Sequence, residues 1–187
     1  MSKKYELVVD DTITFWGWKL FRIKALISFG SVDAGDLGGY IHTEDNLSQE
    51  GNAWVSDDAK VYGNAWVYGN AWVYGNAWVS GDAWVYGNAW VYGNARVSGD
   101  ARVSGNVEVS GDVIVQSMRD YIVFKNHWSS GRYFTWTRSN DMWRVGCFYG
   151  TGQELIDKAY RDSKKSGDFY KAYVEFVEKL EADDDTK

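Results

Sequence analysis

The sequence contains no proline, one cysteine and two histidines. The lone Cys147 excludes a disulfide framework and a cysteine-based zinc site, because both need several thiols. His42 and His127 supply too few imidazoles for a histidine-based metal site, so we expect no metal and no cofactor. The sequence also lacks a run of about 18 apolar residues, and its first residues lack the apolar core of a secretory signal. We therefore expect a cytoplasmic protein without a membrane partner.

Glycine (20 residues) and aromatic residues (17%) are abundant instead, and they recur with a period of six. Residues 51–116 form eleven consecutive hexads of the pattern Gly-Asn-Ala-Trp-Val-Tyr. Valine occupies the fifth place in every hexad, from Val55 to Val115. Glycine followed by Asn or Asp occupies the first two places, except at Asp57-Asp58. Such a fixed period indicates a repeat architecture.

Alternation along each hexad explains how it can fold. Successive side chains of a strand point to opposite faces, so Ala and Val share one face while Trp and Tyr share the other. Gly-Asn and Gly-Asp are turn dipeptides. Hairpins would reverse the chain at every hexad and bury nothing. Coiling the same way at each corner stacks equivalent strands and fills the interior with Ala and Val, which predicts a parallel β-helix.

The hexads resemble the left-handed parallel β-helix family of hexapeptide-repeat proteins, in which three hexads form a triangular coil of 18 residues. Sixty-six residues then give about 3.5 to 4 coils. We expect a mainly β protein in three parts. These are a β-rich N-terminal cap (1–50), the β-helix (51–116) and an α+β C-terminal module (117–187).

The flanking segments carry their own signals. Apolar runs on both sides of Gly17 predict a hairpin. Ile41 and Leu47 lie at six-residue intervals before Ala53, which predicts an irregular first coil in phase with it. Residues 121–125, 132–138 and 142–149 predict a three-stranded meander. The capping box Thr151-Gly-Gln-Glu predicts a helix to about residue 165, a break at 166–168 and a second helix after it.

Folding the hexads at 18 residues per coil predicts which side chains stack on the outside. The columns are Trp54, Trp72, Trp90 and Glu108; Lys60, Trp78, Arg96 and Ile114; and Trp66, Trp84 and Arg102, with tyrosines such as Tyr74 and Tyr92 beside them. Large exposed aromatic surfaces indicate interaction sites. Three interpretations stay open: stacking that only stabilises the sheet, oligomerisation, or binding. The candidate interaction surface comprises Trp54, Trp72, Trp90, Trp66, Trp84, Tyr74 and Tyr92. Relatives of this type often trimerise through their prism faces, so we expect a homo-oligomer, with a trimer favoured.

The resemblance also sets a test for catalysis. Carbonic anhydrases of this β-helix class need three zinc-binding histidines, and its acyltransferases need a histidine base and a loop protruding from a coil. Residues 51–116 contain no histidine and no slip in the period. We therefore expect no enzyme activity and no catalytic residue. An acyltransferase-like enzyme with an external histidine, such as His42, is the alternative, and a structural oligomerisation module is another.

Charge divides the chain unevenly. The net charge is −6, which disfavours duplex nucleic acid, yet residues 117–150 hold five basic and two acidic residues. Aromatic rings together with guanidinium groups suit a nucleotide, by stacking and by phosphate contact. Alternatively, these aromatics pack on the helices and the arginines face water. The candidate ligand residues are Arg138, Arg144, Trp136, Trp143, Arg132 and Tyr149.

Residues 29–39, 46–55, 136–140 and 146–152 resemble segments of phage and prophage proteins of this β-helix type. The resemblance implies a small accessory protein of a mobile element. We expect a non-catalytic binding protein that acts in the host cytoplasm. It would counter host defence, either by sequestering a nucleotide-type small molecule or by docking on a host protein.

Overall fold

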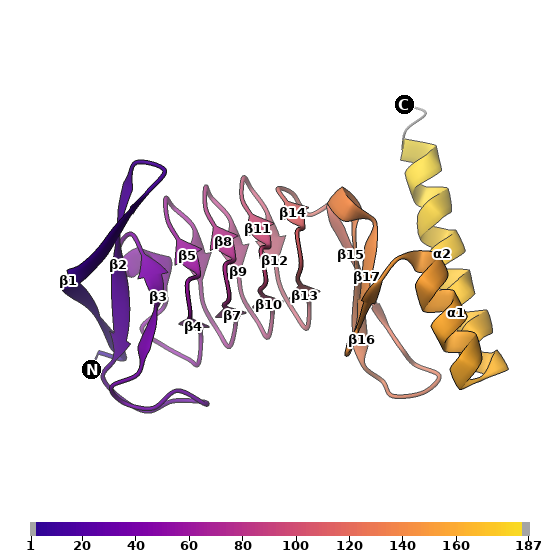
Figure 1. Cartoon of the computed structure of the whole chain (residues 1–187), viewed down its shortest axis with the longest axis horizontal. Helices are drawn as coiled ribbons and strands as arrows, with labels where there is room; N and C mark the ends of the chain where they lie inside the picture. Colours follow the sequence, from indigo (N-terminus) through magenta and orange to yellow (C-terminus); the bar gives the residue numbers. More distant parts are fainter. Residues whose placement is uncertain (1–2, 185–187) are drawn as a thin grey trace.

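A computed structural model describes residues 3–184. The centre of the molecule is a parallel β-solenoid of about four turns, confirming the mainly β architecture (Figure 1). Its strands are β4 (Trp54–Val55), β5 (Lys60–Val61), β6 (Trp66–Val67), β7 (Trp72–Val73), β8 (Trp78–Val79), β9 (Trp84–Val85), β10 (Trp90–Val91), β11 (Arg96–Val97), β12 (Arg102–Val103), β13 (Glu108–Val109) and β14 (Ile114–Val115).

The strands stack with a constant offset of 18 residues, as the hexads predict. Trp72 pairs with Trp54 and Trp90, Trp78 pairs with Lys60 and Arg96, and Trp84 pairs with Trp66 and Arg102. Three flat faces result, built on β4-β7-β10-β13, on β5-β8-β11-β14 and on β6-β9-β12. Every fifth-place valine from Val55 to Val115 is fully buried, and the third-place alanines fill the remaining interior.

The corners explain the repeated Gly-Asn. Gly87 has a φ of 70°, and a Cβ there would lie 2.8 Å from the backbone nitrogen of Gly105 in the next coil. Only glycine combines this backbone conformation with such a close approach. Asn70 receives a side-chain hydrogen bond from Asn52 and donates one to Asn88, each at 3.1 Å. The second hexad place therefore forms an amide ladder along the edge of the prism.

The N-terminal segment extends one face of the solenoid. Strands β1 (Tyr5–Phe15) and β2 (Trp18–Ala25) form the predicted hairpin, and Trp16 and Gly17 make its turn with φ of 50° and 84°. Strand β2 pairs with β3 (Leu37–Ile41), which pairs in parallel with β5. The face on β5-β8-β11-β14 thus becomes a seven-stranded sheet.

The phase predicted for the first coil is wrong. Ile41 pairs with Val61 and Leu47 with Val67, so both occupy the valine column and not the alanine column of Ala53. Two extra residues therefore lie between Leu47 and Ala53, after the short helix η1 (Glu44–Asn46). Gln49 in this insertion accepts a hydrogen bond from the Lys4 backbone at 2.8 Å and donates one to Tyr5 O at 3.2 Å. The insertion anchors the first strand of the protein to the solenoid.

The opposite end of the solenoid is capped by the C-terminal module (Figure 1). Its sheet has four antiparallel strands, β15 (Tyr121–Lys125), β16 (Tyr133–Thr137), β17 (Met142–Val145) and β18 (Phe148–Gly150), with the helix η2 (Arg138–Asn140) between β16 and β17. The predicted three-stranded meander is therefore corrected to four strands, because Gly146 adopts a φ of 56° and turns the chain inside residues 142–149. The Tyr121 hydroxyl donates to Arg102 O at 2.6 Å and satisfies a carbonyl near the open end of the solenoid.

Helices α1 (Gly152–Asp162) and α2 (Lys164–Asp184) cover the outer face of this sheet (Figure 1). The predicted capping box is confirmed, since Thr151 and Glu154 exchange hydrogen bonds. The predicted break at 166–168 is wrong: extended backbone at Ser163 separates the helices, and Gly167 lies within α2. A Cβ at Gly167 would collide with the Tyr160 ring, so this glycine permits close helix packing and does not end a helix.

Among residues 3–184, no helix is long and apolar enough to cross a lipid bilayer.

Candidate functional site

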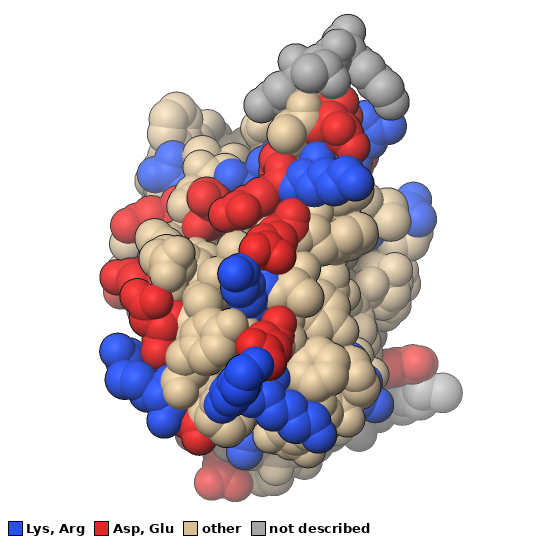
Figure 2. Space-filling view, turned by 90° about the vertical axis from the view of Figure 1, so that its right-hand side faces the viewer, with Lys and Arg blue, Asp and Glu red and all other residues tan. Residues whose placement is uncertain are grey.

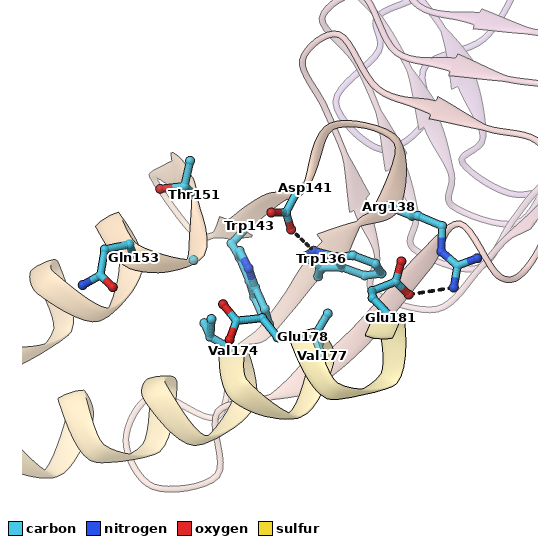
Figure 3. A pocket seen from close by; sticks show the side chains of 11 residues that line it. Trp136, Arg138, Asp141, Trp143, Thr151, Gln153, Val174, Val177, Glu178 and Glu181 are labelled. Carbon is cyan, nitrogen blue, oxygen red and sulfur yellow. Dashed lines mark hydrogen bonds and ion pairs between the residues drawn. The ribbon is translucent and has the colours of Figure 1, made fainter. Parts of the chain in front are cut away.

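The structure brings three of the six ligand residues predicted in the module together. Trp136, Arg138 and Trp143 line a pocket of about 490 Å³ between the sheet and α2, which contributes Glu178 and Glu181 (Figure 3). Asp141 also lines this pocket, so acidic side chains outnumber Arg138 there. Such a charge balance repels phosphate groups.

The polar groups of this module pocket are already engaged. Arg138 forms ion pairs with Glu181 at 2.6 Å and Asp184 at 3.2 Å, and the hydrogen bond from Glu181 contributes most to raising the pKa of Arg138. The Trp136 indole N–H donates to Asp141 at 2.8 Å. Trp136 and Trp143 are only 2% and 1% exposed, so their rings belong to the core and offer little surface for stacking. This arrangement agrees with the alternative of aromatics packed on the helices.

The other three predicted residues lie elsewhere. Arg144 forms an ion pair with Glu108 at 3.3 Å, and its guanidinium carbon lies 5.5 Å from the centre of the Tyr92 ring, both on the solenoid. Trp143 and Arg144 diverge because neighbours on β17 point to opposite faces of the sheet. Arg132 lines a separate hollow with Glu108. The Tyr149 hydroxyl accepts a hydrogen bond from Asn140 at 3.0 Å. The six residues therefore do not form one site.

Figure 2 shows the end of the molecule that the helices cover. Basic and acidic side chains are interleaved over this view, with uncharged surface between them. No broad basic area faces the viewer, so the excess of basic residues in 117–150 does not produce a positive field on this face.

The aromatic columns of the solenoid are covered to different degrees. Trp54 is 2% exposed because the rings of Tyr5 and Phe29 pack on its edges. Phe15 and Trp16 from the N-terminal hairpin pack against Trp78. These contacts agree with the interpretation of intramolecular stabilisation. Other rings stay open to solvent, and Trp90 is 47% exposed.

One open stretch of aromatic surface is hollowed. Ser31, Ser56, Asp57, Trp72, Tyr74 and Trp90 line a cleft of about 480 Å³ on the face built by β4, β7 and β10. We call it the aromatic cleft. Tyr74 stacks on Tyr92 with ring centres 4.7 Å apart and planes within 5°. Tyr74 and Trp90 meet at 77°, with centres 6.4 Å apart, and so form two walls of the cleft.

Two departures from the hexad pattern create the aromatic cleft. Ser56 occupies the place before Tyr74 in the tyrosine column, so no ring covers the free face of Tyr74. Asp57 replaces the glycine found at the start of the other ten hexads and still adopts a φ of 55°. A side chain at a left-handed position costs free energy, and such strain is concentrated at functional sites.

The electrostatics of the cleft are acidic. Asp57 Oδ2 accepts a hydrogen bond from the Gly75 backbone at 3.0 Å, whereas Oδ1 forms no hydrogen bond or ion pair within residues 3–184. None of the six lining residues is basic. Burial, with smaller contributions from Tyr92, Glu108 and Asp57, raises the pKa of Tyr74 to about 12. The Tyr74 hydroxyl therefore stays neutral at physiological pH.

The sequence had placed Trp72, Tyr74 and Trp90 on the interaction surface but had not identified Ser31, Ser56 or Asp57. The available signal for the last two was their departure from the Gly and Tyr places of the hexad. Ser31 carried no comparable signal, because the loop before β3 has no period that would position it.

The two histidines lie apart from both pockets. The His42 ring packs edge-on against Trp18 with ring centres 4.6 Å apart, and its buried Nδ1 has no hydrogen-bond partner within residues 3–184. His127 is exposed beside Trp128 and Phe169 in the module.

Comparison with known families bears on the solenoid alone. The hexads match the family model of the YdcK beta-solenoid repeat. Its four matches cover residues 59–75, 71–87, 89–105 and 95–111, all within the eleven hexads. This likeness supports the β-solenoid and does not extend to the hairpin or the C-terminal module. A search of the curated proteins finds no match to the chain.

Proposed function

We propose that this is a non-catalytic binding protein whose ligand enters the aromatic cleft. The observation that carries the proposal is the ring face of Tyr74, which is left uncovered beside the exposed Trp90 and a carboxylate with an unpaired oxygen. Stacked rings that only stabilised the sheet would not need a strained aspartate next to them. A concave aromatic site with a few polar groups is the usual form of a binding pocket.

The cleft favours docking on a protein over sequestration of a nucleotide. It has no basic side chain to pair with phosphate, and the arginines of the module are paired with carboxylates. The nucleotide site at Arg138 and Arg144 stays a prediction. Its test is calorimetry with an Arg138→Ala variant, which the nucleotide hypothesis expects to bind about ten- to a hundredfold more weakly.

The biological setting is part of the same proposal. The resemblance to phage and prophage proteins and to the hexapeptide-repeat class supports an accessory protein that docks on a host protein in the host cytoplasm and thereby counters defence. An acyltransferase would need a histidine base at a substrate cleft, and neither His42 nor His127 lines the aromatic cleft.

A fragment screen tests the proposal. The chain holds eleven tryptophans, and 5-fluorotryptophan labelling with fluorine NMR reports on each of them once assigned. We expect fragments that perturb Trp72 and Trp90 and that no longer bind to a Ser56→Tyr variant, in which a new ring completes the tyrosine column. Fragments that perturb only Trp136 and Trp143 would move the site to the module pocket and overturn the proposal.

The expected homotrimer also stays a prediction. Trp54 and Trp78 have intramolecular cover, whereas Trp66 and Trp84 on the β6-β9-β12 face stack on each other and on Tyr68. This face is the one that supports self-association. Light scattering at high micromolar concentration should give a trimer mass, and a monomer mass would contradict the expectation.

A further inference from the structure

The chain repeatedly combines an arginine, an aromatic ring and a carboxylate. Arg22 lies over the Tyr40 ring, with its guanidinium carbon 4.4 Å from the ring centre, and forms an ion pair with Asp11 at 2.8 Å. Arg144 lies over Tyr92 at 5.5 Å and pairs with Glu108 at 3.3 Å. In each case the ring meets the flat face of the cation while a carboxylate binds its N–H groups, an arrangement suited to guanidinium.

The Tyr92 example ends the same tyrosine column that opens into the aromatic cleft. Tyr92 has Tyr74 on one face, 4.7 Å away, and Arg144 over its ring. Tyr74 has Tyr92 on one face and the cleft beside Ser56 on the other. One end of this two-ring stack is therefore covered by an arginine paired with Glu108. The other end is open and lies beside Asp57, which has no cation partner within residues 3–184.

We infer that the aromatic cleft accepts the guanidinium group of an arginine side chain on a partner protein. The guanidinium would stack on Tyr74 and bind the Asp57 carboxylate, as Arg144 does with Tyr92 and Glu108. This inference rests on the proposed function and specifies the chemistry of the partner.

The shape and charge of the cleft distinguish guanidinium from other ligands. A vacancy in a parallel ring stack suits a flat group, whereas an ammonium or a trimethylammonium group is rounded. Phosphate would meet an unpaired carboxylate and no basic side chain. A neutral flat ring could stack on Tyr74 but would leave Asp57 Oδ1 without a partner. Only a flat cation uses both features, and Arg96 over Trp78 at 4.5 Å shows that the outer face of the solenoid holds such stacks.

Matched small probes test the inference directly. We would titrate the protein with N-acetyl-arginine amide and follow the indole N–H signals of Trp72 and Trp90 by NMR. N-acetyl-citrulline amide is the control, because it has nearly the same shape without the charge. We expect saturable shifts with the arginine probe and at least about tenfold weaker binding of the citrulline probe. Probes with lysine and trimethyllysine test whether any cation suffices.

Three variants locate the effect. Asp57→Asn keeps an acceptor for the Gly75 N–H but removes the charge, and it should weaken the arginine probe about tenfold. Asp57→Gly restores the hexad pattern, relieves the left-handed strain and should lose binding to the same extent while folding normally. Ser56→Tyr should abolish binding by filling the vacancy. Asp82→Asn, on a corner outside the cleft, is the matched control and should bind like the wild type.

Each other outcome overturns the inference in a distinguishable way. Equal binding of arginine and citrulline, or wild-type affinity in Asp57→Asn, would reject the guanidinium and leave the cleft as a binding site. Tighter binding of trimethyllysine would replace the flat cation with a rounded one. If no probe shifts Trp72 and Trp90, the inference fails, and the fragment screen alone then decides whether the cleft binds anything.

Discussion

The solenoid and the C-terminal module differ in where they carry information. In the solenoid every coil buries the same Ala and Val residues, so the core is uniform and the departures from the repeat stand out. In the module no residue has a repeated equivalent, and a mixed core of rings and aliphatic side chains packs between sheet and helices. Its conspicuous residues, Trp136 and Arg138, have structural partners. In a repeat protein, exceptions are therefore better guides to function than unusual residues in a non-repeating part.

The largest effect that we expect comes from breaking the solenoid core. Val73 is fully buried and pairs with Val55 and Val91 in the neighbouring coils. Val73→Asp buries a carboxylate without a partner and should lower the free energy of unfolding by about 3 kcal/mol or more. Urea unfolding followed by circular dichroism measures this loss. Asn76→Asp, on the outside of the same coil, should stay near wild type, and a comparable loss there would contradict the assignment of faces.

The corresponding break in the module should spare the solenoid. Trp143 is buried among Phe124, Phe134 and the helices, so Trp143→Ala should cost about 3–5 kcal/mol. Because solenoid coils are stabilised by their neighbours, we expect helical circular dichroism to be lost at lower urea than the sheet signal. Coincident loss of both signals would show that the two parts unfold as one unit.

Corner residues should give a smaller effect of opposite sense at two equivalent places. Gly87→Asp places a Cβ against Gly105 at a φ of 70° and should cost about 1–3 kcal/mol. Asp57→Gly loses the hydrogen bond to Gly75 but relieves strain, so its net change should be less than about 1 kcal/mol. Parallel thermal unfolding of both variants tests this contrast. A loss at Asp57→Gly as large as that at Gly87→Asp would assign Asp57 a purely structural role.

The smallest expected effect is a pH response at the N-terminal end of the solenoid. Lys4 donates to Ala53 O at 2.9 Å, and burial lowers its pKa from 10.5 to about 8. Between pH 8 and 10 the unfolded chain holds more protons on this group than the folded chain, so the free energy of unfolding should rise with pH. We expect a rise on the order of 1 kcal/mol after allowance for solvent screening.

Lys4→Met is the control for this pH response, because it removes the titrating group and keeps an unbranched side chain. Subtracting its curve also removes the contribution of the tyrosines, whose raised pKa values act above pH 10. The same slope in Lys4→Met would assign the response to another group.

The sequence by itself determined the solenoid. A period of six without slip forces Val73 to lie beside Val55 and Val91, because any other register would move valines out of the core. Hence the columns of Trp54, Trp78 and Trp66 could be predicted residue by residue. The phase of Leu47 could not, since the repeat is interrupted there by two residues that the hexads do not record.

Only the tertiary structure decided what the exceptions and the module do. Gly167 looks like a helix breaker in the sequence, yet its contact with the Tyr160 ring keeps it inside α2. Arg138 and Arg144 look like one site, yet one faces Glu181 on α2 and the other Glu108 on the solenoid. The physical reason is that periodic stacking is settled by nearest neighbours of known spacing. A side chain in a non-repeating module instead finds its partner on elements whose positions no local pattern encodes, and the aromatic cleft likewise exists only once Ser31 closes over Asp57 and Tyr74.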